Sequence, residues 1–372
     1  MDHGRARVMP DRANVERRGS LGMAGANDLA LFLGFFSGVV EVIFRRDLLP
    51  EKFFYDGDTI IAIAQGRIES GGDTSFGNVA RIYQILGLSE RPFIASFVGF
   101  SLFFLTLVML RKRLEAAQLT FGSALAFYLA SVLGGVYLGY YSKDVVVSVL
   151  VIACFGAYNN ARVRLLIIIS FMVVYGLMFR QYWLAVLLAF VLFRTLKILT
   201  FRARTLVATV AATSAVVSLF VFKWLDLSGP NAIRTSINDS RLGSPDAASA
   251  IGAFFRQDSV LAGVLNVVLA LFLLTVPVAL AMLGTPYYVF LAVCIAFIWS
   301  FVFRGVLGRR TALGNQFFVD SMCMILALVA VQAVFEPDYG SALRHWTPML
   351  PFMLFVGFFV ATLREVDRRS LV

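Results

Sequence analysis

Residues 93–110 read FIASFVGFSLFFLTLVML, without a charged side chain, and the three residues that follow are Arg111, Lys112 and Arg113. An apolar stretch of about 18 residues or more is long enough to cross a bilayer as a helix. A backbone in lipid must satisfy its own hydrogen bonds, so membrane spans are helices or closed barrels. This stretch is continuously apolar and does not alternate, which predicts a helix.

The rest of the chain repeats this pattern. Of its 372 residues 59% are hydrophobic and only 15% are charged, against about 25% in soluble domains. The mean hydropathy is +0.80. We therefore predict an all-α, polytopic transmembrane helix bundle of about 10–12 spans. We place eleven spans, near 28–44, 93–110, 119–139, 145–158, 164–179, 182–200, 205–224, 260–283, 286–303, 317–335 and 348–363.

The net charge of +10 would suit a nucleic-acid partner, but the basic residues lie in short clusters between apolar stretches. Such clusters mark cytoplasmic loops, so we expect no nucleic acid. The expected organisation is a single membrane domain over 28–363, without a cleaved signal peptide and without an internal repeat. It is flanked by basic cytoplasmic tails, 1–27 and 364–372, and has outer loops near 45–92, 225–259 and 336–347.

The span count conflicts with the charges. Eleven spans that start from a cytoplasmic N-terminus place the C-terminus outside, whereas its basic tail and the loop with Arg304, Arg309 and Arg310 favour the inside. We expect both termini inside, with ten or twelve spans, and one segment between 225 and 303 to be misassigned.

The spacing of the cysteines and histidines does not match a metal site. Cys154, Cys294 and Cys323 all lie within apolar stretches and form no CxxC pattern, and His3 is far from His345. We therefore predict neither a metal nor a cofactor.

Polar residues near membrane depth are costly and are candidates for function. In the first outer loop, Asp56 and Asp58 follow three aromatic residues. They could bind a sugar, position an acceptor hydroxyl or hold a divalent ion; alternatively the segment is an interfacial aromatic belt followed by a turn.

Two short hairpins lie on the same predicted side. Lys143, after a capping Ser142, could help to hold a phosphate at a helix N-terminus, or it could simply extend to the interface. Arg180 has a planar fork that suits a phosphate, and Tyr182 could stack on a lipid or a sugar. The alternative for this second hairpin is an interfacial anchor.

Two later loops carry further candidates. Arg241 is the best of the polar residues in the loop 225–259, which could be a binding loop or a flexible solvated one. The loop 336–347 combines Asp338 with Arg344 and His345, and so pairs a proton acceptor with a phosphate-binding cation. The alternative there is a polar loop capped by an interfacial tryptophan.

These hairpins and loops resemble those of bacterial Wzy-type and EpsG-like polysaccharide polymerases, within the GT-C class of lipid-linked glycosyltransferases. The likeness covers most of the chain as a pattern. It is carried by Ser142-Lys143-Asp144, Arg180-Gln181-Tyr182-Trp183, the loop around Thr235–Ile251, and Asp338-Tyr339-Gly340-Ser341 with Arg344-His345.

The resemblance implies a multi-pass protein of the bacterial inner membrane that polymerises undecaprenyl-pyrophosphate-linked oligosaccharides into O-antigen, capsule or exopolysaccharide. Its partners would be that lipid-linked oligosaccharide, membrane lipid, a flippase and a chain-length regulator. Cations must then stabilise the leaving pyrophosphate, and an acceptor must receive the hydroxyl proton. The candidate cations are Lys143, Arg180, Arg241 and Arg344; the candidate acceptors are His345, Asp338 and Asp56.

Three alternatives remain open. A flippase or transporter would have internal symmetry and polar residues deep in its spans; Glu41 and Asp320 could form a proton path, although both lie near span ends. The chain could also be an O-antigen ligase, or a GT-C-like transferase of a polyprenyl-monophosphate sugar, and Asp56 and Asp58 could be the acidic pair of that second class. A noncatalytic assembly subunit would tolerate loss of the basic residues.

Overall fold

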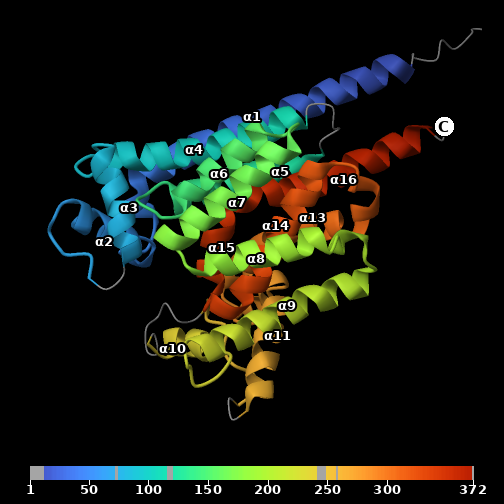
Figure 1. Cartoon of the computed structure of the whole chain (residues 1–372). Helices are drawn as coiled ribbons and strands as arrows, with labels where there is room; N and C mark the ends of the chain where they lie inside the picture. The colour runs from blue at the N-terminus through green and yellow to red at the C-terminus, as the bar shows by residue number, and fades with distance from the viewer. Residues whose placement is uncertain (1–11, 72–73, 115–119, 241–248, 257–258, 371–372) are drawn as a thin grey trace, which may run out of the picture.

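Figure 1 shows the computed structural model of the chain as a bundle of helices. The structure describes residues 12–71, 74–114, 120–240, 249–256 and 259–370. Within these residues the regular elements are helices. Ala250 and Asp338 form one isolated β-bridge outside them. The all-α prediction is thus confirmed for the described part of the chain.

Eight of the described helical segments have the length and apolar composition to cross a membrane. These are Gly25–Leu48 within α1 (Arg12–Leu48), α4 (Pro92–Arg113), α5 (Phe121–Leu138), α7 (Ala161–Met178), α9 (Ala203–Trp224), α13 (Pro286–Ala312), α14 (Gln316–Phe335), and Tyr339–Arg364, which joins α15 (Tyr339–Trp346) to α16 (Leu350–Ser370). Three shorter apolar helices are α6 (Val145–Gly156), α8 (Tyr182–Thr195) and α11 (Val260–Thr275). The prediction of a polytopic membrane bundle is confirmed; its GT-C-like character stays a prediction.

Local signals explain where these helices begin. Asn160 and Asn315 cap α7 and α14, and each accepts a hydrogen bond from the backbone amide three residues on, at 3.1 and 2.9 Å. Pro92 begins α4 at a position where a backbone N–H would have no helical partner. The helix starts therefore lie within a few residues of the predicted ones.

The bundle has a basic end and a polar end. At the basic end, α4 and α13 finish with arginines in their last turns. The polar end carries the short helices α2 (Tyr55–Ala64), α3 (Thr74–Ile85) and α10 (Ala232–Ser240), together with α15 (Figure 1). The three outer segments that were predicted as loops are thus partly helical, which hydropathy alone does not predict.

The position of α11 resolves the conflict over the span count. After α9 ends at Trp224, Arg234 donates to the backbone oxygen of Glu336 at 3.0 Å, so this part of the chain is at the polar end. The start of α13 is at the same end, where the Tyr287 ring lies 6.0 Å from Lys52. Figure 1 shows α11 running across the direction of the long helices. The predicted span 260–283 is therefore not a crossing, and ten of the described helices run between the two ends.

Both ends of the described chain lie at the basic end, where α1 begins and α16 finishes (Figure 1). This matches the even number of crossings that the charges favoured. At the centre of the bundle is α14, of which 94% of the span is buried inside the protein. Its polar-end terminus leads directly into the loop and helix that carry Glu336, Arg344 and His345.

Candidate functional site

A cavity of about 450 Å³ opens at the polar end. This volume lies within the range of small-molecule sites, roughly 300–1,000 Å³. Its walls come from α2, the end of α5, the two hairpins after α5 and α7, the start of α13, and α15. The lining side chains include Lys52, Phe53, Asp56, Tyr137, Tyr140, Ser142, Arg180, Tyr287, Tyr288, Asp338, Ser341, Arg344 and His345.

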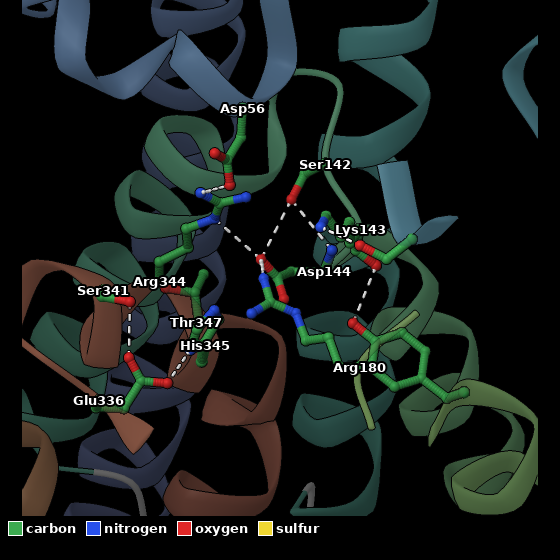
Figure 2. Close-up of polar contacts among 12 residues, drawn as sticks. Asp56, Ser142, Lys143, Asp144, Arg180, Glu336, Ser341, Arg344, His345 and Thr347 are labelled. Atoms are coloured by element: carbon green, nitrogen blue, oxygen red, sulfur yellow. Dashed lines mark hydrogen bonds and ion pairs between the residues drawn. The ribbon is translucent and has the colours of Figure 1, made fainter. Parts of the chain in front are cut away.

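Arg344 joins two segments of the wall. It projects from α15, whose first turn is held by Asp338, because the Asp338 carboxylate accepts the Ser341 backbone N–H at 2.8 Å. Its Nη1 donates to Oδ2 of Asp56 at 2.7 Å, and its Nε donates to Oδ2 of Asp144 at 3.0 Å (Figure 2). Residues from α2, α6 and α15 are thereby fixed around one guanidinium.

Asp144 is the shared partner of two arginines. Arg180, from the hairpin between α7 and α8, donates through Nη2 to the same Asp144 oxygen at 3.3 Å. The Asp144 side chain is only 3% exposed. Burial alone would raise the pKa of Asp144, but the charges of Arg180 and Arg344 outweigh it and hold that pKa well below the usual carboxyl range. Asp144 is therefore an anion that fixes both guanidinium groups.

Cations and carboxylates are nearly balanced around the cavity. Lys52, Arg180 and Arg344 line it together with Asp56 and Asp338, and Lys143, Asp144 and Glu336 lie just behind the lining. Burial would raise the pKa of Asp56, but Arg344, Lys143 and Arg180 together lower it. The buried Nε of Arg180 has no hydrogen-bond partner. An anionic group in the cavity would thus meet two guanidinium groups that carboxylates already hold in position.

Glu336 and His345 form a second polar pair beside the arginines. Nδ1 of His345 is in hydrogen-bond contact with Oε1 of Glu336, and the Ser341 hydroxyl donates to the other Glu336 oxygen at 2.7 Å (Figure 2). Burial would raise the pKa of Glu336, but His345, Ser341 and Arg180 lower it below its usual value. An ionised Glu336 is an acceptor for an N–H at Nδ1 of His345, and Nε2 is the ring nitrogen on the side away from Glu336.

Tyrosines form the other wall. Tyr137, at the end of α5, Tyr140, just after it, and Tyr287 and Tyr288, at the start of α13, all line the cavity. Tyr140 is held in place, because its ring lies 4.1 Å from the Arg45 guanidinium. Aromatic faces with hydroxyl groups can contact both the apolar faces and the hydroxyls of a sugar.

The structure brings most of the predicted site residues together. Asp56, Arg180, Asp338, Arg344 and His345 all line the cavity, although they come from separate segments of the chain. Their chemical roles stay predictions.

The other predicted residues lie around the cavity or elsewhere. Lys143 donates to the Ser75 hydroxyl at 2.6 Å and so extends towards α3. The Tyr182 ring lies behind the wall, with its centroid 6.3 Å from that of His345. Asp58 forms an ion pair with Arg46 near the surface, and Arg241 lies outside the described residues.

Sequence reasoning missed the residues that orient the site. Asp144 and Glu336 stood out only as parts of polar segments, yet they hold the arginines and the histidine in place. A carboxylate directly before an apolar span needs a cationic partner, and this signal could have identified Asp144. Tyr287 and Tyr288 cannot be distinguished by sequence from an interfacial aromatic belt.

No protein-family model, curated protein or solved structure matches this chain. Among the described residues, no group of three or more histidine, cysteine, aspartate or glutamate side chains is placed to hold a metal ion. The basis for assigning a function is therefore the geometry of the cavity, together with the motif resemblance.

Proposed function

We propose that this chain is a glycosyltransferase whose donor sugar is linked to a polyprenyl pyrophosphate. In the specific form of the proposal, it polymerises oligosaccharide repeat units into O-antigen, capsule or exopolysaccharide at the periplasmic face of a bacterial inner membrane. One observation carries the proposal: Arg180 and Arg344, which both line the cavity, share the buried Asp144 behind them, and the same cavity is lined by His345, which contacts Glu336.

The arginines match the leaving group of this reaction. When the bond between the sugar and the pyrophosphate breaks, the pyrophosphate oxygen keeps the electron pair and gains negative charge. Fixed guanidinium donors stabilise such charge most effectively when they are already oriented before the reaction. Asp144 provides this orientation, since it holds Arg180 at 3.3 Å and Arg344 at 3.0 Å.

The histidine matches the acceptor. In the proposed step, Nε2 of His345 takes the proton of an acceptor hydroxyl, and the hydroxyl oxygen forms a bond to the anomeric carbon of the donor. The bond from that carbon to the pyrophosphate oxygen breaks, and polyprenyl pyrophosphate leaves. Glu336 stabilises the positive charge that His345 gains, because it contacts Nδ1 on the opposite side of the ring.

The location of the cavity suits a lipid-linked substrate. It lies at one end of a bundle of membrane helices, so a polyprenyl tail can stay in lipid while its head group enters the cavity. The tyrosine wall provides aromatic surface for the sugar. Under the polymerase form of the proposal, a flippase delivers the substrate and a chain-length regulator limits the product.

A second candidate is a transferase that uses a polyprenyl-monophosphate sugar, with Asp56 as the proton acceptor. The observation that favours it is that Asp56 lies in the first outer segment, lines the same cavity and contacts Arg344 at 2.7 Å. The two candidates differ in the essential group: Asp56→Asn would abolish transfer in the second, whereas His345→Ala would abolish it in the first.

Complementation in the organism of origin tests the proposal. The gene is deleted and restored with Arg180→Gln, Arg344→Gln, or the control Arg46→Gln, which changes a largely exposed arginine at the same end. We expect the two cavity variants to lose long-chain surface polysaccharide on a gel and Arg46→Gln to retain it. Normal long chains from membrane-inserted Arg180→Gln and Arg344→Gln proteins would refute the proposal.

A further inference from the structure

A second cavity, of about 530 Å³, lies at the basic end between α7, α8 and α14. It is separate from the cavity described above, which lies at the polar end. The side chains deep in its walls are apolar and come from all three helices: Leu165, Ile169, Phe190 and Val319. Arg194, Lys197 and Gln316 contribute polar atoms to the same cavity. An apolar groove with cations is thus open where the bundle meets the membrane surface.

A buried ion network lies next to this groove and shares Arg194 with its lining. Asp320 is paired through Oδ2 with Arg164 and through Oδ1 with Arg194, at 2.7 and 2.8 Å. The Asp320 and Arg164 side chains are 2% and 1% exposed, so their charges neutralise each other inside the protein. Arg194 is 21% exposed, and its other contact is Gln316 at 3.5 Å, the limit of a hydrogen bond. Arg194 therefore retains donors for a ligand at the groove.

Lys197 adds a second positive charge. It follows α8 with a φ of 49°, in the left-handed region that residues other than glycine rarely adopt. Such conformations often occur at functional sites. The side chain is exposed and lines the groove. The charge of Asp320 is balanced by Arg164. The groove therefore keeps two net positive charges, those of Arg194 and Lys197.

We propose that this groove binds an anionic phospholipid. One acyl chain lies between α7, α8 and α14, and the phosphate-bearing head group contacts Arg194 and Lys197. Charge complementarity favours this occupant, because the basic end is the side on which a positive-inside topology places the cytoplasm, and the cytoplasmic leaflet is rich in anionic lipid. Basic pockets between membrane helices on that side are known to bind anionic head groups. The proposal does not depend on the function of the other cavity.

Native mass spectrometry of the purified full-length protein tests this proposal. The protein in detergent is titrated with phosphatidylglycerol or with phosphatidylcholine that carries the same acyl chains. We expect phosphatidylglycerol to bind at least about fivefold more tightly, as one basic contact at the membrane surface contributes about that factor. Lys197→Gln, outside the Asp320 network, should lower the affinity for phosphatidylglycerol about fivefold.

Three further arms test whether the preference for phosphatidylglycerol arises at this groove. Arg204→Gln removes an exposed cation at the same end, outside the groove, and should leave the preference unchanged. Ile169→Trp, which fills the groove, should weaken both lipids. Inorganic phosphate should not displace the bound lipid. Equal affinity for the two lipids, equal effects of Lys197→Gln and Arg204→Gln, or displacement by phosphate would each overturn the proposal.

Discussion

Replacement of Arg344 by glutamine should destabilise the protein through the charge it leaves behind. Arg344 contacts Asp56 at 2.7 Å and Asp144 at 3.0 Å. The Asp56 side chain is 39% exposed, and such surface pairs contribute roughly 0–1 kcal/mol. Asp144 is 3% exposed, and loss of one partner of a buried pair costs about 3–5 kcal/mol. Since Arg180 remains at 3.3 Å, we expect a loss near the lower end, about 3 kcal/mol.

The matched control is Arg46→Gln at the same end of the bundle. Arg46 and its ion-pair partner Asp58 are 56% and 44% exposed, and Arg46 also donates to the Tyr140 hydroxyl at 3.0 Å, so this change should cost about 1 kcal/mol or less. Apparent unfolding midpoints of both proteins can be compared by intrinsic fluorescence in one detergent at one heating rate. A shift of about 2 °C per kcal/mol gives a midpoint roughly 6 °C lower for Arg344→Gln.

A second substitution identifies the cause of that loss. If the Asp144–Arg344 pair is responsible, Asp144→Asn should lower the midpoint less in the Arg344→Gln background than in the wild-type protein. Equal midpoints for Arg344→Gln and Arg46→Gln, or equal effects of Asp144→Asn in the two backgrounds, would show that Asp144 does not depend on Arg344 for its charge balance.

Further predictions concern the histidine pair, the pH range and the shape of the cavity. His345→Ala should lower the transfer rate about 10²–10⁴-fold, whereas Glu336→Gln should lower it less while donor affinity is retained; unchanged rates at saturating donor would contradict this. The lowered pKa of Asp144 means that its ion pairs stabilise the fold fully above about pH 4 and lose effect as the pH falls towards that lowered pKa. The difference in unfolding midpoint between the wild-type protein and Asp144→Asn should thus stay constant from about pH 7 to 5, and a change in that difference within the window would count against the assignment. A Cβ at Gly57 would lie 2.2 Å from the Tyr140 ring, so Gly57→Ala should weaken donor binding, while Gly156→Ala, which meets open space, should not.

Much of the fold could be predicted from hydropathy, because each crossing needs a long apolar stretch and each loop between crossings needs polar residues. The exception, 260–283, is apolar but does not cross. Apolar composition shows that a helix is surrounded by protein or lipid, but it does not show the direction in which the helix runs. A transverse helix that packs against α9 and α14 therefore has the same composition as a membrane span. The helix ends at Thr275, just before Val276 and Pro277. That proline was the available sign that the stretch is interrupted.

The site was partly predictable for a related reason. Charged residues in short turns between spans are conspicuous, and five of the predicted ones line one cavity. Their pairings were not predictable, because Arg344 and Asp144 are far apart in the sequence and meet only when α15 packs beside the α5–α6 hairpin. Adjacent residues can differ in this respect. Lys143 contacts Ser75 of α3, whereas Asp144 contacts both Arg180 and Arg344, and the sequence alone does not distinguish these two outcomes.

The most direct test of the proposed function is turnover by the purified protein. The protein is reconstituted in liposomes with a polyprenyl-pyrophosphate-linked oligosaccharide, and released polyprenyl pyrophosphate is measured together with the length of the glycan. The wild-type protein should release the carrier and lengthen the glycan, Arg180→Gln and Arg344→Gln should each be about 10²-fold slower or more, and Arg46→Gln should be close to wild type. Absence of carrier release by the folded wild-type protein, or equal rates for all four proteins, would contradict the assignment of this cavity as a glycosyl-transfer site.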